Sequence, residues 1–163
     1  MPTTRDYTAL LTRSPLPDSA TLIERMQWVV DLLWEAFHQQ GVSWVGFYLD
    51  HPEALDDARM TLGPRRDTPA CSPIGLHGAC GRVLLSGRPL IVHDVAELGA
   101  NYIACDPRDR SEIVLPIFDD TGRVIAVLDL DSWDIGSFTE ADADGLRAVL
   151  HHAGLHAGLN ADH

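Results

Sequence analysis

Apolar residues recur at intervals of three and four between residues 20 and 40. They are Leu22, Ile23, Met26, Val29, Val30, Leu33, Trp34 and Phe37. This spacing is typical of an amphipathic helix, because it gathers the apolar side chains on one face. The pattern predicts a helix over about residues 20–40 that Asp18 or Ser19 caps and Gly41 ends.

Further along the chain, the pattern favours strands. Segments with strand composition are 42–49, 58–62, 90–92, 113–118 and 124–131. The last two flank the sequence Asp-Asp-Thr-Gly at 119–122, which predicts a β-hairpin because Asp and Gly suit tight turns. A short helix is expected at 81–85, and Thr139 with Asp142 resembles the capping box of a terminal helix.

The order of these elements is helix, two strands, an irregular middle, a hairpin and a helix, without alternating βαβ units. It predicts an α+β fold, in which the N- and C-terminal helices pack on an antiparallel sheet of about six strands. We expect an N-terminal arm at residues 1–19, a single domain over residues 20–158 and a tail at residues 159–163.

Charge and hydropathy narrow the classes of function. The 163 residues carry a formal net charge of -12, and all 12 basic residues are Arg. This charge opposes binding to nucleic acid or anionic membranes, since both need clustered positive charge. No stretch approaches the roughly 18 to 20 apolar residues of a membrane span, and the N-terminal residues lack the apolar core of a signal peptide. We expect a cytoplasmic protein that binds neither nucleic acid nor membranes.

Three cysteines are the first candidates for chemistry. An odd count without a secretory signal argues against a structural disulfide framework and leaves free, reactive or metal-binding thiols. Cys71 and Cys80 lie in a Gly-rich stretch, and Cys105 lies in the irregular segment 94–111. A lone cysteine is more often a small buried hydrophobe, but three in irregular segments favour reactivity. Arginines near Cys105 in sequence could favour its thiolate form.

Zinc is the other interpretation of these thiols, with His77 or His93 as the fourth ligand. Structural zinc sites prefer ligand pairs that are two to four residues apart. The intervals between the cysteines are nine and 25 residues, so no metal is expected.

Two acids alternate with leucines in the second hairpin strand. The period of two puts Asp129 and Asp131 on one face, and antiparallel pairing would bring Glu112 beside them. Buried acids are costly without a cationic partner. Either the strand reaches solvent here, or the acids form a site for a cation or an ammonium group.

Trp44 and Tyr48 share one face of the predicted strand 42–49, with Gly46 between them. They are core aromatics when considered alone. If they face the acids and thiols, they form an aromatic wall for a small organic group, and Gly46 leaves room for it.

Six segments taken in order are similar to motifs of the free methionine-(R)-sulfoxide reductases. They are Trp44-Val45-Gly46-Phe47-Tyr48, Pro69-Ala70-Cys71, Gly78-Ala79-Cys80-Gly81, Ile103-Ala104-Cys105-Asp106, Ser111-Glu112-Ile113-Val114-Leu115-Pro116 and Val127-Leu128-Asp129-Leu130-Asp131-Ser132. The similarity spans about residues 20–155 and includes all three cysteines, so it is more specific than membership of the GAF superfamily.

The resemblance implies a GAF fold whose small-molecule pocket is a redox active site. The implied reaction is reduction of free L-methionine-(R)-sulfoxide, with no bound cofactor. By resemblance, Cys105 is the nucleophile that becomes a sulfenic acid, Cys71 is the resolving thiol that condenses with it, and Cys80 is an additional or alternative resolving thiol. Thioredoxin would then reduce the disulfide.

The resemblance also assigns substrate-binding residues. Glu112, Asp129 and Asp131 would hold the α-ammonium, while Trp44 and Tyr48 would surround the methyl group of the sulfoxide. Peptide-bound methionine has no free α-ammonium, so the acids would select the free amino acid. The alternative is a non-catalytic GAF module that senses a small molecule or the redox state. A homodimer is considered as the assembly.

Overall fold

The computed structural model describes residues 4–67, 69–101 and 105–158. The α-helices in this part are α1 (Leu22–Phe37), α2 (Ala79–Ser86) and α3 (Glu140–His152). The strands are β1 (Trp44–Asp50), β2 (Met60–Arg66), β3 (Leu90–Val92), β4 (Ser111–Phe118) and β5 (Val124–Ser132). Short 3-10 helices are η1 (Thr8–Thr12), η2 (Asp56–Ala58) and η3 (Val95–Asn101).

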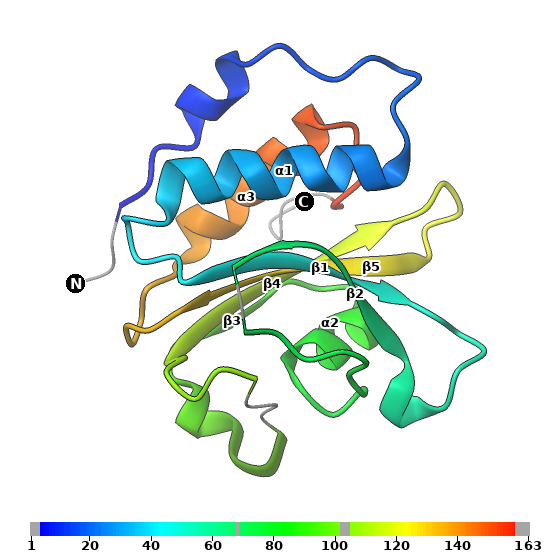
Figure 1. Ribbon diagram of the computed structural model, residues 1–163, viewed down its shortest axis with the longest axis vertical. Helices are drawn as coiled ribbons and strands as arrows, with labels where there is room; N and C mark the ends of the chain where they lie inside the picture. Colours follow the sequence, from blue (N-terminus) through cyan, green and yellow to red (C-terminus); the bar gives the residue numbers. More distant parts are fainter. Residues whose placement is uncertain (1–3, 68, 102–104, 159–163) are drawn as a thin grey trace.

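The strands form one antiparallel sheet in the order β2-β1-β5-β4-β3. It has five strands where about six were expected, and the predicted α+β class is confirmed. Helices α1 and α3 cover one face of the sheet, and α2 lies on the other face (Figure 1). Within the residues that the structure describes, no helix is long and apolar enough to cross a membrane.

Helix α1 follows the predicted periodicity, but its cap differs from the prediction. The Thr21 hydroxyl accepts a hydrogen bond from the backbone N–H of Glu24 at 3.1 Å, and the Glu24 carboxylate accepts one from the N–H of Thr21 at 3.0 Å. The prediction of Asp18 or Ser19 as the cap is therefore wrong, because only Thr21 has Glu at the third helical position to complete the capping box.

The predicted hairpin is present between β4 and β5. The Asp119 carboxylate accepts hydrogen bonds from the backbone N–H groups of Thr121 and Arg123, at 2.9 and 3.0 Å. Gly122 has φ of +88°, a left-handed conformation that glycine adopts without a steric penalty. This turn sets the register of β4 against β5.

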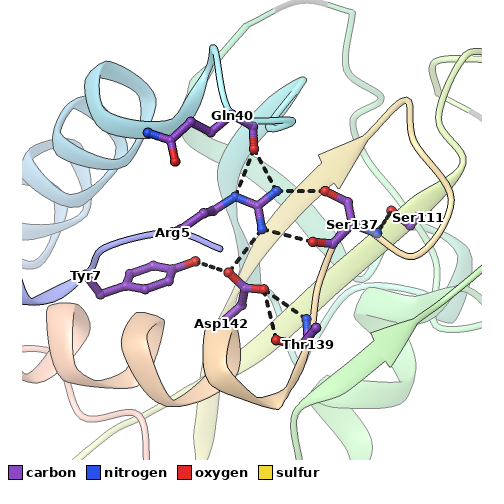
Figure 2. A network of polar contacts seen from close by, with 7 residues as sticks. All are labelled: Arg5, Tyr7, Gln40, Ser111, Ser137, Thr139 and Asp142. Atoms are coloured by element: carbon purple, nitrogen blue, oxygen red, sulfur yellow. Dashed lines mark hydrogen bonds and ion pairs between the residues drawn. The ribbon is translucent and has the colours of Figure 1, made fainter. Parts of the chain in front are cut away.

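The N-terminal arm packs against the domain through a buried arginine (Figure 2). The Arg5 guanidinium donates to the carbonyl oxygens of Gln40 and Ser137 and to the carboxylate of Asp142, all within 3.0 Å. The Tyr7 hydroxyl donates to the same carboxylate at 2.7 Å. The arm is thereby joined to α3 and to the connections beside β1 and β5. The predicted tail at 159–163 lies outside the described residues.

Alternation along the strands divides the interior into two layers. Val45 and Phe47 of β1 pack with α1 and α3, whereas Trp44 and Tyr48 pack in the layer that contains α2. The same alternation on β5 directs Leu128 toward the two long helices. The second layer is the side of the sheet on which the polar side chains gather.

Candidate active site

Three carboxyl groups meet on the α2 side of the sheet. Glu112 of β4 pairs with Asp131 of β5, and Asp129 lies two residues before Asp131 on the same face. One carboxyl oxygen from each residue lies within 4.8 Å of those from the other two. Glu112, Asp129 and Asp131 are only 8%, 5% and 9% exposed. The strand therefore does not reach solvent here, and the hairpin register assembles the acid trio, by which we mean Glu112, Asp129 and Asp131.

The acid trio shares protons instead of carrying three charges. Burial, followed by the charge of a neighbouring carboxyl, raises the pKa of each member well above its ordinary value. Hydrogen-bonding contacts link the Glu112 carboxyl to those of both Asp129 and Asp131. Carboxyls this close lose their protons as one coupled system. An added cation would compensate the charges of the ionised forms.

A pocket opens above the acid trio. It is lined by Trp44, Tyr48, Pro69, Ala70, Ile74, Ala79, Cys80, Cys105, Asp109, Glu112, Asp129 and Asp131. Among these residues there is no basic side chain. One oxygen of Asp129, Oδ1, and the indole N–H of Trp44 are buried without a hydrogen-bond partner among the described residues. The pocket thus offers one unused acceptor and one unused donor to a ligand.

Two aromatic rings form one wall of the pocket. The ring centroids of Trp44 and Tyr48 are 6.0 Å apart, and both residues are buried. A Cβ atom at Gly46 would collide with the indole of Trp44. The expectation that Gly46 leaves room for a ligand is therefore wrong, because the Trp44 ring fills that space.

Cys71 and Cys105 form a disulfide; their Cα atoms are 5.4 Å apart, and the two residues are 34 positions apart in sequence. The chain thus has one disulfide, although its odd cysteine count argued against a disulfide framework. A sulfur in a disulfide is not a thiolate ligand, so the zinc interpretation does not describe this state. Cys105 lines the pocket, and the Tyr48 hydroxyl donates to the carbonyl of Cys71 at 2.9 Å.

Cys80 is a buried free thiol at the start of α2. Burial and then the charges of Asp129 and Glu112 raise its pKa well above the ordinary value, and it donates a hydrogen bond to Asp129. A Cβ atom at Gly81 would collide with the backbone of Leu76, so the preceding loop packs closely on α2. Cys80 is therefore held as a neutral thiol beside the acid trio.

Arg108, three residues after Cys105, does not support a thiolate from within the pocket. Arg108 is exposed, pairs with Asp106 at 3.0 Å and lies over the Trp133 ring at 4.2 Å. The positive charge of Arg108 is thus directed outward, because Asp106 and Trp133 bind it at the surface.

Asp109 is a pocket residue that the sequence pattern did not indicate. It lines the pocket, is 7% exposed, and has a pKa raised to about 7 by burial and by the charge of Asp106. Its only sequence signal was its position in the irregular segment between Cys105 and Glu112, where no periodicity indicates a direction for the side chain.

Comparison with known proteins places the chain in a family. A GAF domain model matches residues 19–156. The free methionine-R-sulfoxide reductase of Escherichia coli is 38% identical over 111 residues, which is 67% of this chain and 62% of that relative. The reduced fRMsr of Staphylococcus aureus has a TM-score of 0.80 and 31% identity, covering 92% of this chain and 94% of that chain. The chain belongs to the free methionine-R-sulfoxide reductase family.

A further structure, that of free methionine-R-sulfoxide reductase from Neisseria meningitidis in complex with its substrate, supports this placement. It is 30% identical, with a TM-score of 0.68, and covers 91% of this chain and 86% of that chain. The family resemblance and the GAF fold predicted from the motifs are both confirmed. The relatives that carry this name are reductases. It spans less than two thirds of the length of the Escherichia coli relative.

Proposed function

We propose that the protein reduces free L-methionine-(R)-sulfoxide to L-methionine. One observation carries the proposal: the Cys71–Cys105 disulfide and the acid trio belong to a single pocket, to whose lining Cys105 contributes. A redox pair supplies two electrons, and an acidic pocket whose described lining contains no basic residue suits a ligand with an ammonium group. The relatives named free methionine-R-sulfoxide reductase from Escherichia coli and Neisseria meningitidis support this substrate.

The acid trio accounts for selection of the free amino acid. An α-ammonium placed against Glu112, Asp129 and Asp131 favours their ionised forms and binds the unused Oδ1 of Asp129. A methionine sulfoxide residue in a peptide has an amide at this position and leaves the buried acids without a cation. Rejection of a ligand that leaves buried polar groups unpaired is strong.

The sulfoxide end of the substrate lies toward the aromatic wall and Cys105 in this proposal. Trp44 and Tyr48 provide apolar contact for the methyl group. The unpaired indole N–H of Trp44 donates to a substrate oxygen, which satisfies a buried donor that has no partner among the described residues.

The chemistry follows from the two linked thiols. The Cys105 thiolate attacks the sulfur of the sulfoxide, the oxygen passes to Cys105 as a sulfenic acid, and methionine leaves. Cys71 then condenses with the sulfenic acid, which forms the disulfide and releases water. Thioredoxin reduces this disulfide by thiol exchange and restores both thiols. Cys80 stays neutral beside Asp129 and is not needed for this cycle.

Each cycle begins with two free thiols, and this requirement favours a cellular compartment that keeps thiols reduced. Cytoplasmic thioredoxin keeps such thiols reduced, so we propose that the protein works in the cytoplasm. The homodimer considered from the sequence stays a prediction.

A coupled assay tests the proposed function. Purified protein is incubated with thioredoxin, thioredoxin reductase and NADPH, and the R and S diastereomers of free methionine sulfoxide are supplied separately. We expect NADPH consumption with the R form alone and its loss in Cys105→Ser. Binding of the R form by folded, reduced protein without turnover would contradict the enzyme and support the sensor alternative.

A further inference from the structure

Asp109 is a fourth carboxyl in the pocket, separate from the acid trio on the sheet. It lies in the connection between η3 and β4, four residues after Cys105. The hydroxyl of Ser43, just before β1, donates to its Oδ1 at 3.4 Å, and Asp131 lies within hydrogen-bonding distance on the β5 side. Asp109 therefore lies between the element that carries Cys105 and the strand that carries two of the acids.

Backbone hydrogen bonds hold this connection in place. The N–H of Asp109 donates to the carbonyl of Asp106 at 3.1 Å, and the N–H of Arg110 donates to the carbonyl of Ser132 at 2.8 Å. The carbonyl of Arg110 in turn accepts from the N–H of Val95 at 2.8 Å. The Asp109 side chain is thus directed into the pocket by a connection anchored on both sides.

The groups around Asp109 favour its neutral form. Burial, and then the charge of Asp106, raise its pKa to about 7. Hydrogen bonds with Ser43 and Asp131 and the charge of the Arg108 guanidinium lower the pKa of Asp109. From the sheet, Glu112 of β4 also faces Asp109, and the charge of Asp109 raises the pKa of Glu112.

Asp129 and Asp131 of β5 face Asp109 as well. A bound ammonium affects the protonation of these two acids differently from that of Asp109. An opposite charge favours ionised carboxylates, so substrate binding removes protons from the trio. Ionised Asp131 then acts as a like charge on Asp109 and helps it to keep its proton. The acids that hold the ammonium become poor proton donors, whereas Asp109 stays a competent one.

We propose that Asp109 is the acid that protonates the sulfoxide oxygen when the Cys105 thiolate attacks, an inference that rests on the proposed function. A bond forms between Cys105 Sγ and the substrate sulfur, and the oxygen takes the proton of Asp109. The oxygen then moves to Cys105: the S–O bond of the substrate and the bond between the two sulfurs break, an S–O bond to Cys105 forms, and methionine leaves. Methionine sulfur gains two electrons, and Cys105 loses two in becoming a sulfenic acid. Asp109 then takes up a proton from water. This proton balances the one that Cys105 released when it became a thiolate.

A single-turnover experiment without thioredoxin tests this role. Reduced protein is mixed with saturating free methionine-(R)-sulfoxide, and the release of methionine is timed between pH 5 and 9. The wild-type rate falls as Asp109 loses its proton, with a midpoint at or above the pKa of about 7 that Asp109 has in the ligand-free pocket. In Asp109→Asn we expect a rate of methionine release that is lower by roughly 10²- to 10⁴-fold. The plot of this rate against pH should no longer fall with that midpoint.

Arg108→Gln supplies a second readout, which does not depend on the stability of the first variant. Arg108 is exposed, does not line the pocket and lowers the pKa of Asp109. Loss of Arg108 therefore raises that pKa, and the fall in the rate of methionine release moves to higher pH. An Asp109→Asn protein with wild-type rate and pH profile, or an Arg108→Gln protein with an unmoved limb, overturns the role of Asp109. Absence of methionine release from the wild type instead overturns the proposed function itself.

Discussion

Tyr48 donates its hydroxyl hydrogen bond to the backbone carbonyl of Cys71 at 2.9 Å, joining the aromatic wall to one half of the disulfide. The contact crosses from β1 to a connection 23 residues later in the chain. It holds the Cys71 backbone on the same side of the sheet as Cys105. The wall therefore has two tasks in the proposed cycle, since it contacts the substrate and positions the resolving thiol.

Tyr48→Phe separates these tasks because the ring remains and the hydroxyl is lost. A neutral hydrogen bond contributes about 0.5–1.5 kcal/mol, so we expect disulfide formation after substrate reduction to slow by roughly 2- to 10-fold. Methionine release in the first turnover stays within about twofold of the wild type, because the ring still contacts the substrate. Quenched-flow measurements of methionine and free thiols distinguish the two steps.

Tyr7→Phe is the matched control. It removes a buried tyrosine hydroxyl that contacts Asp142 on the opposite side of the sheet, away from the thiols. Disulfide formation as fast in Tyr48→Phe as in Tyr7→Phe would show that the contact to Cys71 has no positioning role.

Glu112→Gln tests recognition of the ammonium. The amide keeps the shape of the side chain but removes one carboxylate, and a hydrogen bond to a charged group contributes about 1.5–3 kcal/mol. We expect the KM for free methionine-(R)-sulfoxide to rise by roughly 10- to 100-fold, with a smaller effect on kcat.

The N-acetylated sulfoxide provides the comparison for that variant, since it has no ammonium group. The wild type should have a much higher kcat/KM for the free substrate than for the acetylated one. In Glu112→Gln the ratio of these two values should be smaller. An unchanged ratio would remove Glu112 from substrate selection.

Arg5→Ala tests the attachment of the N-terminal arm. The Arg5–Asp142 ion pair, at 3.0 Å, has side chains that are 0% and 3% exposed (Figure 2). Removing one partner of a buried pair costs about 3–5 kcal/mol, because the other charge stays buried without compensation. We expect the free energy of unfolding in urea to fall by about that amount.

Arg13→Ala, in the same arm, is the control for Arg5→Ala. Arg13 is exposed, so its substitution should change the free energy of unfolding by less than about 0.5 kcal/mol. Equal losses from the two variants would mean that the buried network does not hold the arm.

Asp129→Asn tests the electrostatics of the acid trio through stability. Burial and the charge of Asp131 raise the pKa of Asp129 in the folded protein above its value in the unfolded chain. Its contribution is therefore fully present below the unfolded pKa of about 3.9 and is lost as pH rises through the folded pKa. Each unit of pKa difference corresponds to about 1.4 kcal/mol. We expect the variant to be more stable than the wild type at pH 8, with a flatter pH dependence between pH 4 and 8.

Asp119→Asn should change the pH dependence of the free energy of unfolding in the opposite direction. Hydrogen bonds from Thr121 and the backbone of Arg123 lower the pKa of Asp119, so its contribution is present above the unfolded pKa and lost as pH falls. Chemical denaturation over the pH series measures both variants. A wild type whose stability did not decline toward pH 8 relative to Asp129→Asn would contradict the raised pKa of the trio.

Local patterns predicted much of the scaffold correctly. The spacing of apolar residues located α1, and the turn sequence at 119–122 located the hairpin and its register. Because side chains alternate along a strand, that register was enough to place Glu112 beside Asp129 and Asp131. The cap of α1 was misplaced by two or three residues, since several polar residues precede the helix and only the full capping box distinguishes Thr21.

What the sequence by itself determined was therefore local and periodic: the helices, the hairpin, and the shared face of the acid trio. The tertiary structure alone decided that the trio is buried, that Trp44 fills the space beside Gly46, and that Asp109 enters the pocket. It also decided the contact of Arg5 with Asp142, which are 137 residues apart. The physical reason is that burial and pKa depend on which distant segments pack together, and an irregular connection has no period from which the direction of its side chains follows.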